Sequence, residues 1–154
     1  LSKVSWAATN NVIFKKSILS KTNIYFDKNL NKFGMGEDQL FFSKLNKKGQ
    51  DIIWANNIKV YEKLHSHRTT NRWIRDRSYR LGVLGNYIDI DLNGQILGYT
   101  LNYIKFIYYF VLSILSLLNI LKKNYYQQFI NLFFRAIGRL LGPFVFKKIN
   151  FYKK

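Results

Sequence analysis

The chain has 154 residues, a formal net charge of +17 and no cysteine. The lack of cysteine excludes disulfides and cysteine-ligated zinc sites, and the length suits one domain with a modest core. Residues 1–91 hold 16 Lys and Arg and all 8 acids, whereas residues 92–154 hold 9 Lys and Arg and no acid. A basic, aromatic and apolar segment of this kind predicts an anionic membrane surface as its partner. Its apolar content is too high for a typical nucleic-acid binder, so we expect no nucleic-acid partner.

Residues 1–91 have the pattern of a mixed α/β region. Because the chain starts at Leu1 and immediately has the pattern of a strand, we expect a further part of the protein to precede it. The best helix covers Asp38–Lys48, with apolar residues on one side, acids at its start and Gly49 after its end. The other expected elements are a β-leaning run Val4–Phe14, a short helix Lys15–Lys21, a loop Asn23–Gly36, strands Asp51–Trp54 and Ile58–Tyr61 flanking an Asn56-Asn57 turn, and an arginine-rich helix Thr70–Asn86.

Leu101–Leu121 is the longest apolar run of the chain. As a helix, its 21 residues extend about 31 Å, which matches a hydrocarbon core of roughly 30 Å. Its one charged residue, Lys105, lies near one end, where its side chain can reach the interface, and tyrosines flank both ends. The alternative is a buried core helix, but a domain this small could hardly cover it on all sides. The run therefore predicts a membrane-inserted helix.

Phe129–Gly142 predicts an amphipathic helix that Pro143 should end. Its polar stripe is narrow and holds two arginines, which favours a position in the plane of the lipid headgroups. A helix packed on the globular domain stays an alternative, because amphipathicity alone does not separate the two. The stripe consists of Asn131, Arg135, Gly138, Arg139 and Gly142.

Glu37 and Asp38 follow Gly36 and open a predicted helix. Acids at a helix N-terminus are most often caps or partners of the helix dipole. Amide donors and the dipole also favour the ionised form of such a carboxylate, and an ionised carboxylate is what a general base must be. Local sequence alone leaves both interpretations open.

Four blocks of the chain carry a recognisable pattern, namely Thr9–Lys16, Phe26-Asp27 with Gly36–Leu45, Gly49–Glu62, and Arg68–Gly82. Taken in order, they resemble the second half of the catalytic domain of family 2 glycosyltransferases with the GT-A fold. The Glu37-Asp38 block resembles the family's glycine-glycine-Glu-Asp signature, although Met35 stands where many members have glycine and Lys44 replaces an arginine. The family's D-x-D metal motif is absent, and Thr69 departs from the motif of processive relatives.

The resemblance implies an α/β fold, namely the acceptor-side half of a GT-A domain with a mixed sheet, followed by membrane-associated helices. It assigns Asp38 as the base that takes the proton from an acceptor hydroxyl, with inversion at the sugar, and Glu37 as its partner in orienting the acceptor. The implied partners are a nucleotide-sugar donor and a glycan or lipid-linked acceptor. A divalent metal, Mg²⁺ or Mn²⁺, is expected in the full-length enzyme with ligands upstream of this chain, and no metal site is expected within it.

Four further residues are candidates for substrate binding. Arg72 and Arg77 are chosen from the arginine-rich helix because guanidinium groups bind phosphate well, although several of these arginines could simply face water or lipid headgroups. Asn10 lies in the first block of the resemblance. Trp73 could stack on a sugar ring, although a tryptophan is more often part of a core.

These observations divide the chain into residues 1–91, an acceptor-side part of a transferase, and residues 92–154, a membrane-associated helical region with helices 101–121 and 129–142. We expect the protein to be attached to a membrane with its catalytic part facing the cytoplasm, in cell-surface polysaccharide or glycan assembly. The alternative is a non-catalytic basic protein that binds anionic lipid at a membrane surface.

Overall fold

The computed structural model describes residues 2–118 and 124–148. The chain divides into two compact units, Leu1–Lys63 and Leu64–Lys154, which we call unit 1 and unit 2. This division falls earlier than the functional boundary predicted at residue 92. The prediction of two functional parts that meet at residue 92 stays a prediction.

Unit 1 is built around one amphipathic helix, α2 (Glu37–Lys47), as the apolar spacing predicts. Buried Phe41, Phe42 and Leu45 form its core cluster. The ring of Phe41 stacks on Phe26 with centroids 4.2 Å apart and lies 5.6 Å from the ring of Phe14. Partly buried apolar residues complete this core, namely Ala7, Val12, Ile18, Leu19, Ile24 and Ile52.

The strands of unit 1 are short. β1 (Ser2–Val4) pairs antiparallel with β2 (Ile52–Trp54), with Ser2 opposite Trp54 and Val4 opposite Ile52. The chain between them forms 3₁₀ turns at Thr9–Asn11 and Lys28–Phe33 and the short helix α1 (Ser17–Thr22).

The expected α/β fold with a mixed sheet is therefore wrong. The described residues are mostly helical, and their only sheet has two strands of three residues each. Most of the β-leaning run Val4–Phe14 is irregular or 3₁₀, and the expected strand Ile58–Tyr61 is not formed. The physical reason is that a strand needs a neighbour for its backbone hydrogen bonds. In the run Ile58–Tyr61, the side chains of Ile58, Val60 and Tyr61 are exposed, so no packing holds this segment as a strand.

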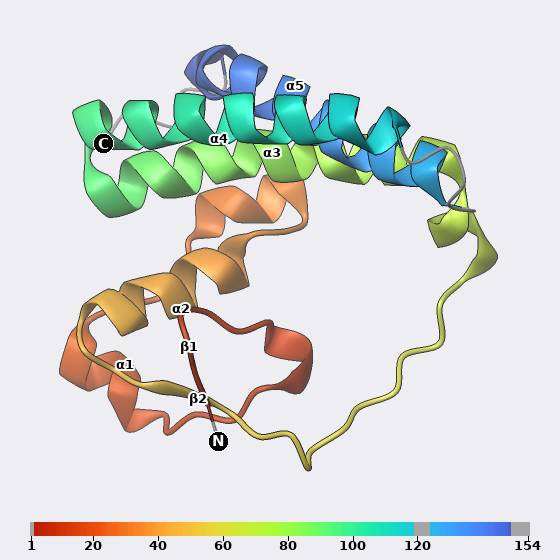
Figure 1. The fold of residues 1–154 in the computed structure, drawn as a ribbon. Helices are drawn as coiled ribbons and strands as arrows, with labels where there is room; N and C mark the ends of the chain where they lie inside the picture. The colour runs from red at the N-terminus through yellow and green to blue at the C-terminus, as the bar shows by residue number, and fades with distance from the viewer. Residues whose placement is uncertain (1, 119–123, 149–154) are drawn as a thin grey trace. The chain divides into compact units, whose positions relative to one another are not determined.

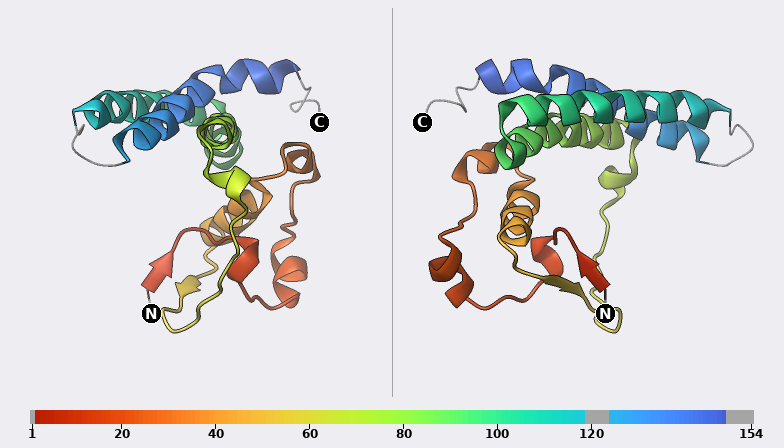
Figure 2. Two further views of the ribbon diagram at one scale, coloured as in Figure 1. Left: turned by 90° about the vertical axis from the view of Figure 1, so that its right-hand side faces the viewer. Right: turned by 60° about the vertical axis from the view of Figure 1, so that its left-hand side comes forward.

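The described residues of unit 2 form a 3₁₀ turn at Ser66–Thr69 and three long helices, α3 (Asn71–Asn93), α4 (Gln95–Leu117) and α5 (Tyr125–Lys148). The Thr70 hydroxyl caps α3 by accepting a hydrogen bond from the N–H of Trp73 at 3.2 Å. Gly94, with φ of 78°, is the single residue between α3 and α4, and the two helices run antiparallel side by side (Figure 1). Two further views show α5 against the same pair (Figure 2), and α5 packs on both helices.

The boundaries of these helices differ from those predicted. α3 continues past Asn86 to Asn93, and α4 begins at Gln95 rather than at Leu101. Residues 119–121 of the predicted apolar helix lie outside the described residues. Pro143 does not end α5, which continues through it to Lys148. A proline can stay inside a helix where the packing of neighbouring helices offsets the lost hydrogen bond.

α3 and α5 approach each other closely through glycines. A Cβ atom added to Gly138 would meet the backbone of Tyr79 and Gly82, and one added to Gly82 would meet the backbone of Arg135 and Gly138. Only residues without a side chain allow two helix backbones to come this near. This contact fixes where α5 lies along α3.

Candidate functional site

The two adjacent carboxylates lie in the first turn of α2, and Gly36, with φ of 93°, turns the chain into that helix. Asp38 is partly buried, and its carboxylate accepts hydrogen bonds from the backbone N–H groups of Thr9 at 3.4 Å and Gln39 at 2.7 Å. The contact with Thr9 joins segments 29 positions apart in the sequence. The side chain is therefore held by two fixed donors and still reaches solvent.

The neighbouring Glu37 is also partly buried, and its Oε2 atom is enclosed with no hydrogen-bond partner among the described residues. A buried oxygen that accepts no hydrogen bond is costly, and such atoms often mark a place where another group binds. Asn10 is exposed in the 3₁₀ turn Thr9–Asn11, next to the residue that contacts Asp38. The structure thus brings three of the six predicted site residues, Asn10, Glu37 and Asp38, into one part of unit 1.

The other three predicted residues belong to unit 2, in the first turns of α3. The ring of Trp73 has two cationic neighbours, since the guanidinium carbon of Arg68 lies 5.4 Å from the ring centroid and that of Arg77 lies 5.0 Å from it. Arg77 is thus engaged with Trp73, while Arg72 is exposed. Within the described part of the chain, Arg72 makes no hydrogen bond and no ion pair.

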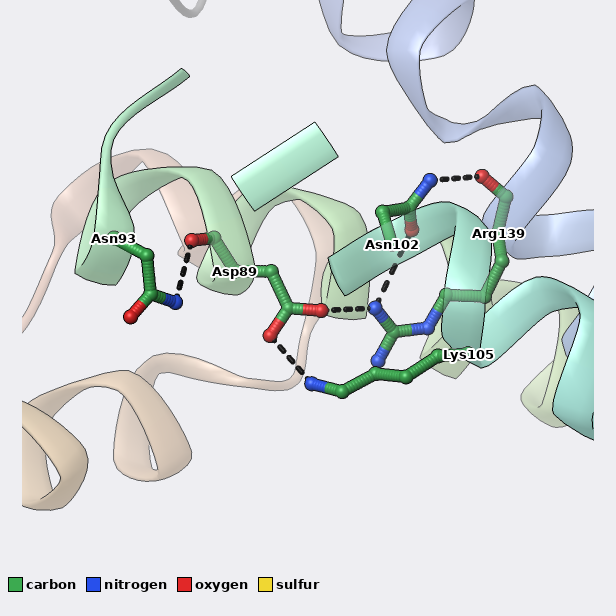
Figure 3. Close-up of polar contacts among 5 residues, drawn as sticks. All are labelled: Asp89, Asn93, Asn102, Lys105 and Arg139. Carbon is green, nitrogen blue, oxygen red and sulfur yellow. Dashed lines mark hydrogen bonds and ion pairs between the residues drawn. The ribbon is translucent and has the colours of Figure 1, made fainter. Parts of the chain in front are cut away.

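A buried polar network joins the three helices of unit 2 (Figure 3). The carboxylate of Asp89 on α3 accepts from the guanidinium of Arg139 on α5 and pairs with the ammonium of Lys105 on α4 at 2.6 Å. The amide of Asn102 donates to the carbonyl oxygen of Arg139 at 3.0 Å. Asp89 and Arg139 are almost completely buried. Since both charges are enclosed, each depends on the other for stabilisation.

The sequence analysis missed this network, although a signal was present. Asp89 stands among Tyr87, Ile88 and Ile90, which are all buried, and Arg139 and Lys105 are charges within largely apolar helices. A charged side chain within an apolar helix needs an opposite charge nearby. The presence of Asp89, Lys105 and Arg139 in such helices therefore predicts that they pair. Lys105 was expected to extend toward the interface, but its ammonium group instead pairs with Asp89.

Much of the polar stripe of α5 contacts the neighbouring helices, although Asn131 is also exposed. Arg139 and Gly138 are buried, Gly142 packs against Asn86, and Asn131 accepts a hydrogen bond from the hydroxyl of Ser78 at 2.9 Å. Glycines and an amide suit such a close helix contact. The predicted position of this helix in the plane of the lipid headgroups stays a prediction.

α4 has its small and polar residues inside and its large apolar residues outside. Its buried residues are Gly98, Asn102, Ser113 and Ser116. The exposed residues include Ile104, Ile107, Tyr108, Phe110, Val111, Ile114 and Leu115. Of its most apolar window, only 17% is buried, and the helix is long and apolar enough to cross a membrane. A core helix of a soluble protein has the opposite pattern, with its apolar residues inside.

The described residues hold no group of three or more His, Asp or Glu side chains that could bind a metal ion. The chain was also compared with protein-family models, with curated proteins and with solved structures, and none of them matches it.

Proposed function

We propose that this chain supplies the acceptor-activating carboxylate of a membrane-attached, inverting glycosyltransferase, with Asp38 as the general base. The observation that carries the proposal is the position of that carboxylate in the first turn of α2, partly buried and bound by two backbone N–H groups. A carboxylate offers about four lone-pair sites, so the two amides leave acceptor capacity for a substrate hydroxyl. The amides also fix its orientation, which general-base catalysis requires.

In the proposed reaction, Asp38 takes the proton of an acceptor hydroxyl as its oxygen attacks the anomeric carbon of a nucleotide sugar. A carbon–oxygen bond forms to the acceptor, the bond to the diphosphate breaks on the opposite face, and the nucleoside diphosphate leaves with the bonding electrons. Attack from the opposite face inverts the anomeric centre. The donor site belongs to residues outside this chain, where a divalent metal such as Mg²⁺ or Mn²⁺ would neutralise the leaving diphosphate.

Glu37 has a different part in this proposal. Its enclosed Oε2 atom has acceptor capacity that no described residue uses. A second hydroxyl of a sugar acceptor is a suitable donor for it, so Glu37 would orient the acceptor while Asp38 takes the proton. Asn10 lies on the adjoining turn and would add an amide contact to the same acceptor.

The test is Asp38→Asn in the full-length enzyme. Asparagine keeps the shape and one of the two backbone contacts but accepts no proton, so turnover should fall by roughly two to four decades, the usual contribution of a positioned general base. Donor binding should change little, because the donor site lies elsewhere. The measurement is transfer of radiolabelled sugar, with donor affinity measured separately by calorimetry.

Asp51→Asn is the matched control, since Asp51 is an exposed carboxylate of the same unit that pairs with Lys3 at 2.7 Å. Its loss should leave turnover unchanged. Near-normal turnover of Asp38→Asn together with an inactive Glu37→Gln would reverse the two roles. If neither substitution lowered turnover, the transferase proposal would fail for this site.

We infer that unit 2 attaches the protein to the membrane through α4. The support is the burial pattern of this helix, in which serines and asparagine face the protein and isoleucines, phenylalanine and tyrosines face outward. In lipid, small residues at helix contacts allow close packing, and outward apolar side chains meet acyl chains at no cost. The close glycine contact between α3 and α5 has the same character.

We further propose that α4 lies in the membrane surface and does not cross the bilayer, with the catalytic part in the cytoplasm. α3 runs beside α4 (Figure 1) and exposes Arg80 near its middle, so a crossing α4 would carry this charge into the hydrocarbon. Such charges are costly there. Cysteine in place of Lys154 gives a direct test in this cysteine-free chain. An impermeant maleimide should label it only after cell lysis, whereas labelling of intact cells would mean that the segment crosses.

A non-catalytic basic protein at a membrane surface is the second candidate, and the exposed face of α4 favours it equally. The two candidates differ in what they require of Asp38. A membrane-surface protein needs no acceptor-binding carboxylate, so in that case Asp38→Asn would change neither activity of the full-length protein nor its membrane attachment.

A further inference from the structure

An open pocket of about 640 Å³ lies between the start of α3 and the start of α5, within unit 2. These two helix starts lie at the same end of the three-helix unit (Figure 1). The pocket has two chemically different parts. α3 contributes Asn71, Arg72 and Arg75, and α5 contributes aromatic and aliphatic side chains that include Phe129, Ile130 and Phe133.

The polar part of the pocket has excess positive charge. Arg72 is exposed and, among the residues described, has no hydrogen-bond or ion-pair partner. Arg75 pairs through its Nε atom with Asp76, at 3.0 Å, and this contact leaves the terminal nitrogens of its guanidinium available. Arg72 and Arg75 are three positions apart on a helix and therefore project to the same side. Two guanidinium groups on one side favour an oxyanion that can accept several hydrogen bonds, such as phosphate.

The apolar part is an aromatic cluster on α5. The rings of Phe129 and Phe133 stack with centroids 5.3 Å apart, and Phe134 meets Phe133 edge to face at 5.6 Å. The guanidinium of Arg75 lies 5.9 Å from the ring of Phe134, at the border between the two parts. The ligand that fits both parts has a phosphate group directly joined to a flexible hydrocarbon.

We propose that this pocket binds the phosphate of a membrane lipid, with Arg72 and Arg75 on the phosphate and the phenylalanines of α5 against the first carbons of the chain. The pocket is formed by α3 and α5, and both helices pack on α4, whose apolar face is the proposed membrane contact. This inference rests on the proposed membrane attachment and does not depend on the transferase chemistry. A lipid-linked acceptor and an anionic bilayer lipid both present this chemistry.

The test uses the full chain in neutral dodecyl maltoside micelles, titrated calorimetrically with dioctanoyl phosphatidic acid. One saturable site is expected, and Arg72→Gln with Arg75→Gln should weaken it at least tenfold, which corresponds to about 1.4 kcal/mol. Both arginines are exposed, so the variant should keep its fold, as circular dichroism would check. Arg80→Gln is the control, because it removes a charge from the same helix outside the pocket.

Two further titrations separate the parts of the ligand. Dioctanoylglycerol has the chains without the phosphate, and inorganic phosphate has the charge without the chains, so each should bind at least tenfold more weakly than the phosphatidic acid. Equal binding of dioctanoylglycerol, or equal binding of inorganic phosphate, would overturn the proposal. Equal weakening by Arg80→Gln would also overturn it, since the effect would then be one of general charge. None of these results depends on turnover, so they can fail while the transferase proposal stands.

Discussion

Helix α2 of unit 1 and helix α4 of unit 2 bury opposite kinds of side chain. In unit 1, α2 turns Phe41, Phe42 and Leu45 inward, which is how a helix folds in water. In unit 2, α4 turns Ser113 and Ser116 inward and its large apolar residues outward. The same chain therefore follows two packing rules, one in which burying apolar surface stabilises the fold and one in which close backbone contact and polar pairing do so.

This difference shows where chemistry can be expected in each unit. In unit 1 the polar groups of interest, Glu37 and Asp38, are only partly buried. In unit 2 they are enclosed between helices, as with Asp89 and Arg139, and hold the helices together. The exposed surface of unit 2 includes the apolar face of α4 and the arginines at the start of α3.

The largest effect should follow from Phe41→Ala, which removes a ring that is 1% exposed and contacts three other phenylalanines. A buried phenylalanine cut to alanine costs about 4 kcal/mol through lost burial and the cavity left behind. Hydrogen exchange of the α2 amides, measured by mass spectrometry, should accelerate by about three decades. An exchange rate within a factor of ten of the parent chain would show that unit 1 does not depend on an apolar core.

Asp89→Ala should have the next largest effect, lowering the free energy of unfolding by about 3 kcal/mol, because it leaves the buried guanidinium of Arg139 without its carboxylate. The loss should appear as faster exchange in α3 and α5. Asp76→Ala is a matched control, since its ion pair with Arg75 is about half exposed and should contribute under 1 kcal/mol. If both variants lost the same free energy of unfolding, Asp89 would stabilise unit 2 no more than an exposed ion pair does.

Gly138→Ala should cost about 2 kcal/mol, because the added methyl group meets the backbone of Tyr79 and Gly82 and pushes α5 away from α3. Gly49→Ala, in unit 1, meets nothing within 4 Å and carries only the strain of a φ of 77°. It should cost about 1 kcal/mol or less. Thermal unfolding in micelles gives both values. A more stable Gly138→Ala chain would show that helix propensity outweighs the glycine contact.

The sequence predicted the helices better than the strands. The apolar spacing of α2 and the length of the apolar run in α4 are local signals, and both helices are present. The mixed sheet was wrong, because a strand depends on a neighbour that local sequence does not reveal, and the run from Ile58 to Tyr61 has none among the described residues. The sequence could place Glu37 and Asp38 together because they are adjacent. Adjacency could not predict the pair of Asp89 and Arg139, which joins residues 50 positions apart.

The smallest effect on folding should come from Ile107→Ser, a substitution on the outward face of α4. Ile107 is 58% exposed, so the stability of unit 2 in micelles should stay within about 0.5 kcal/mol. Binding to vesicles should nevertheless weaken, because the lost apolar surface meets lipid in the proposed arrangement. A partly buried isoleucine contributes about 1 kcal/mol, or roughly fivefold in the partition coefficient.

The control for this substitution is Ser113→Ala on the inward face of the same helix. It removes the hydroxyl that donates to the carbonyl oxygen of Phe110 and leaves the outward face untouched. Its vesicle binding should equal that of the parent chain, so the pair separates the two faces of α4 directly. If Ile107→Ser bound vesicles as well as the parent but unfolded more easily, the exposed face would belong to a protein contact and not to lipid. That result would remove the packing difference between the two units, because α4 would then need an apolar partner just as α2 does.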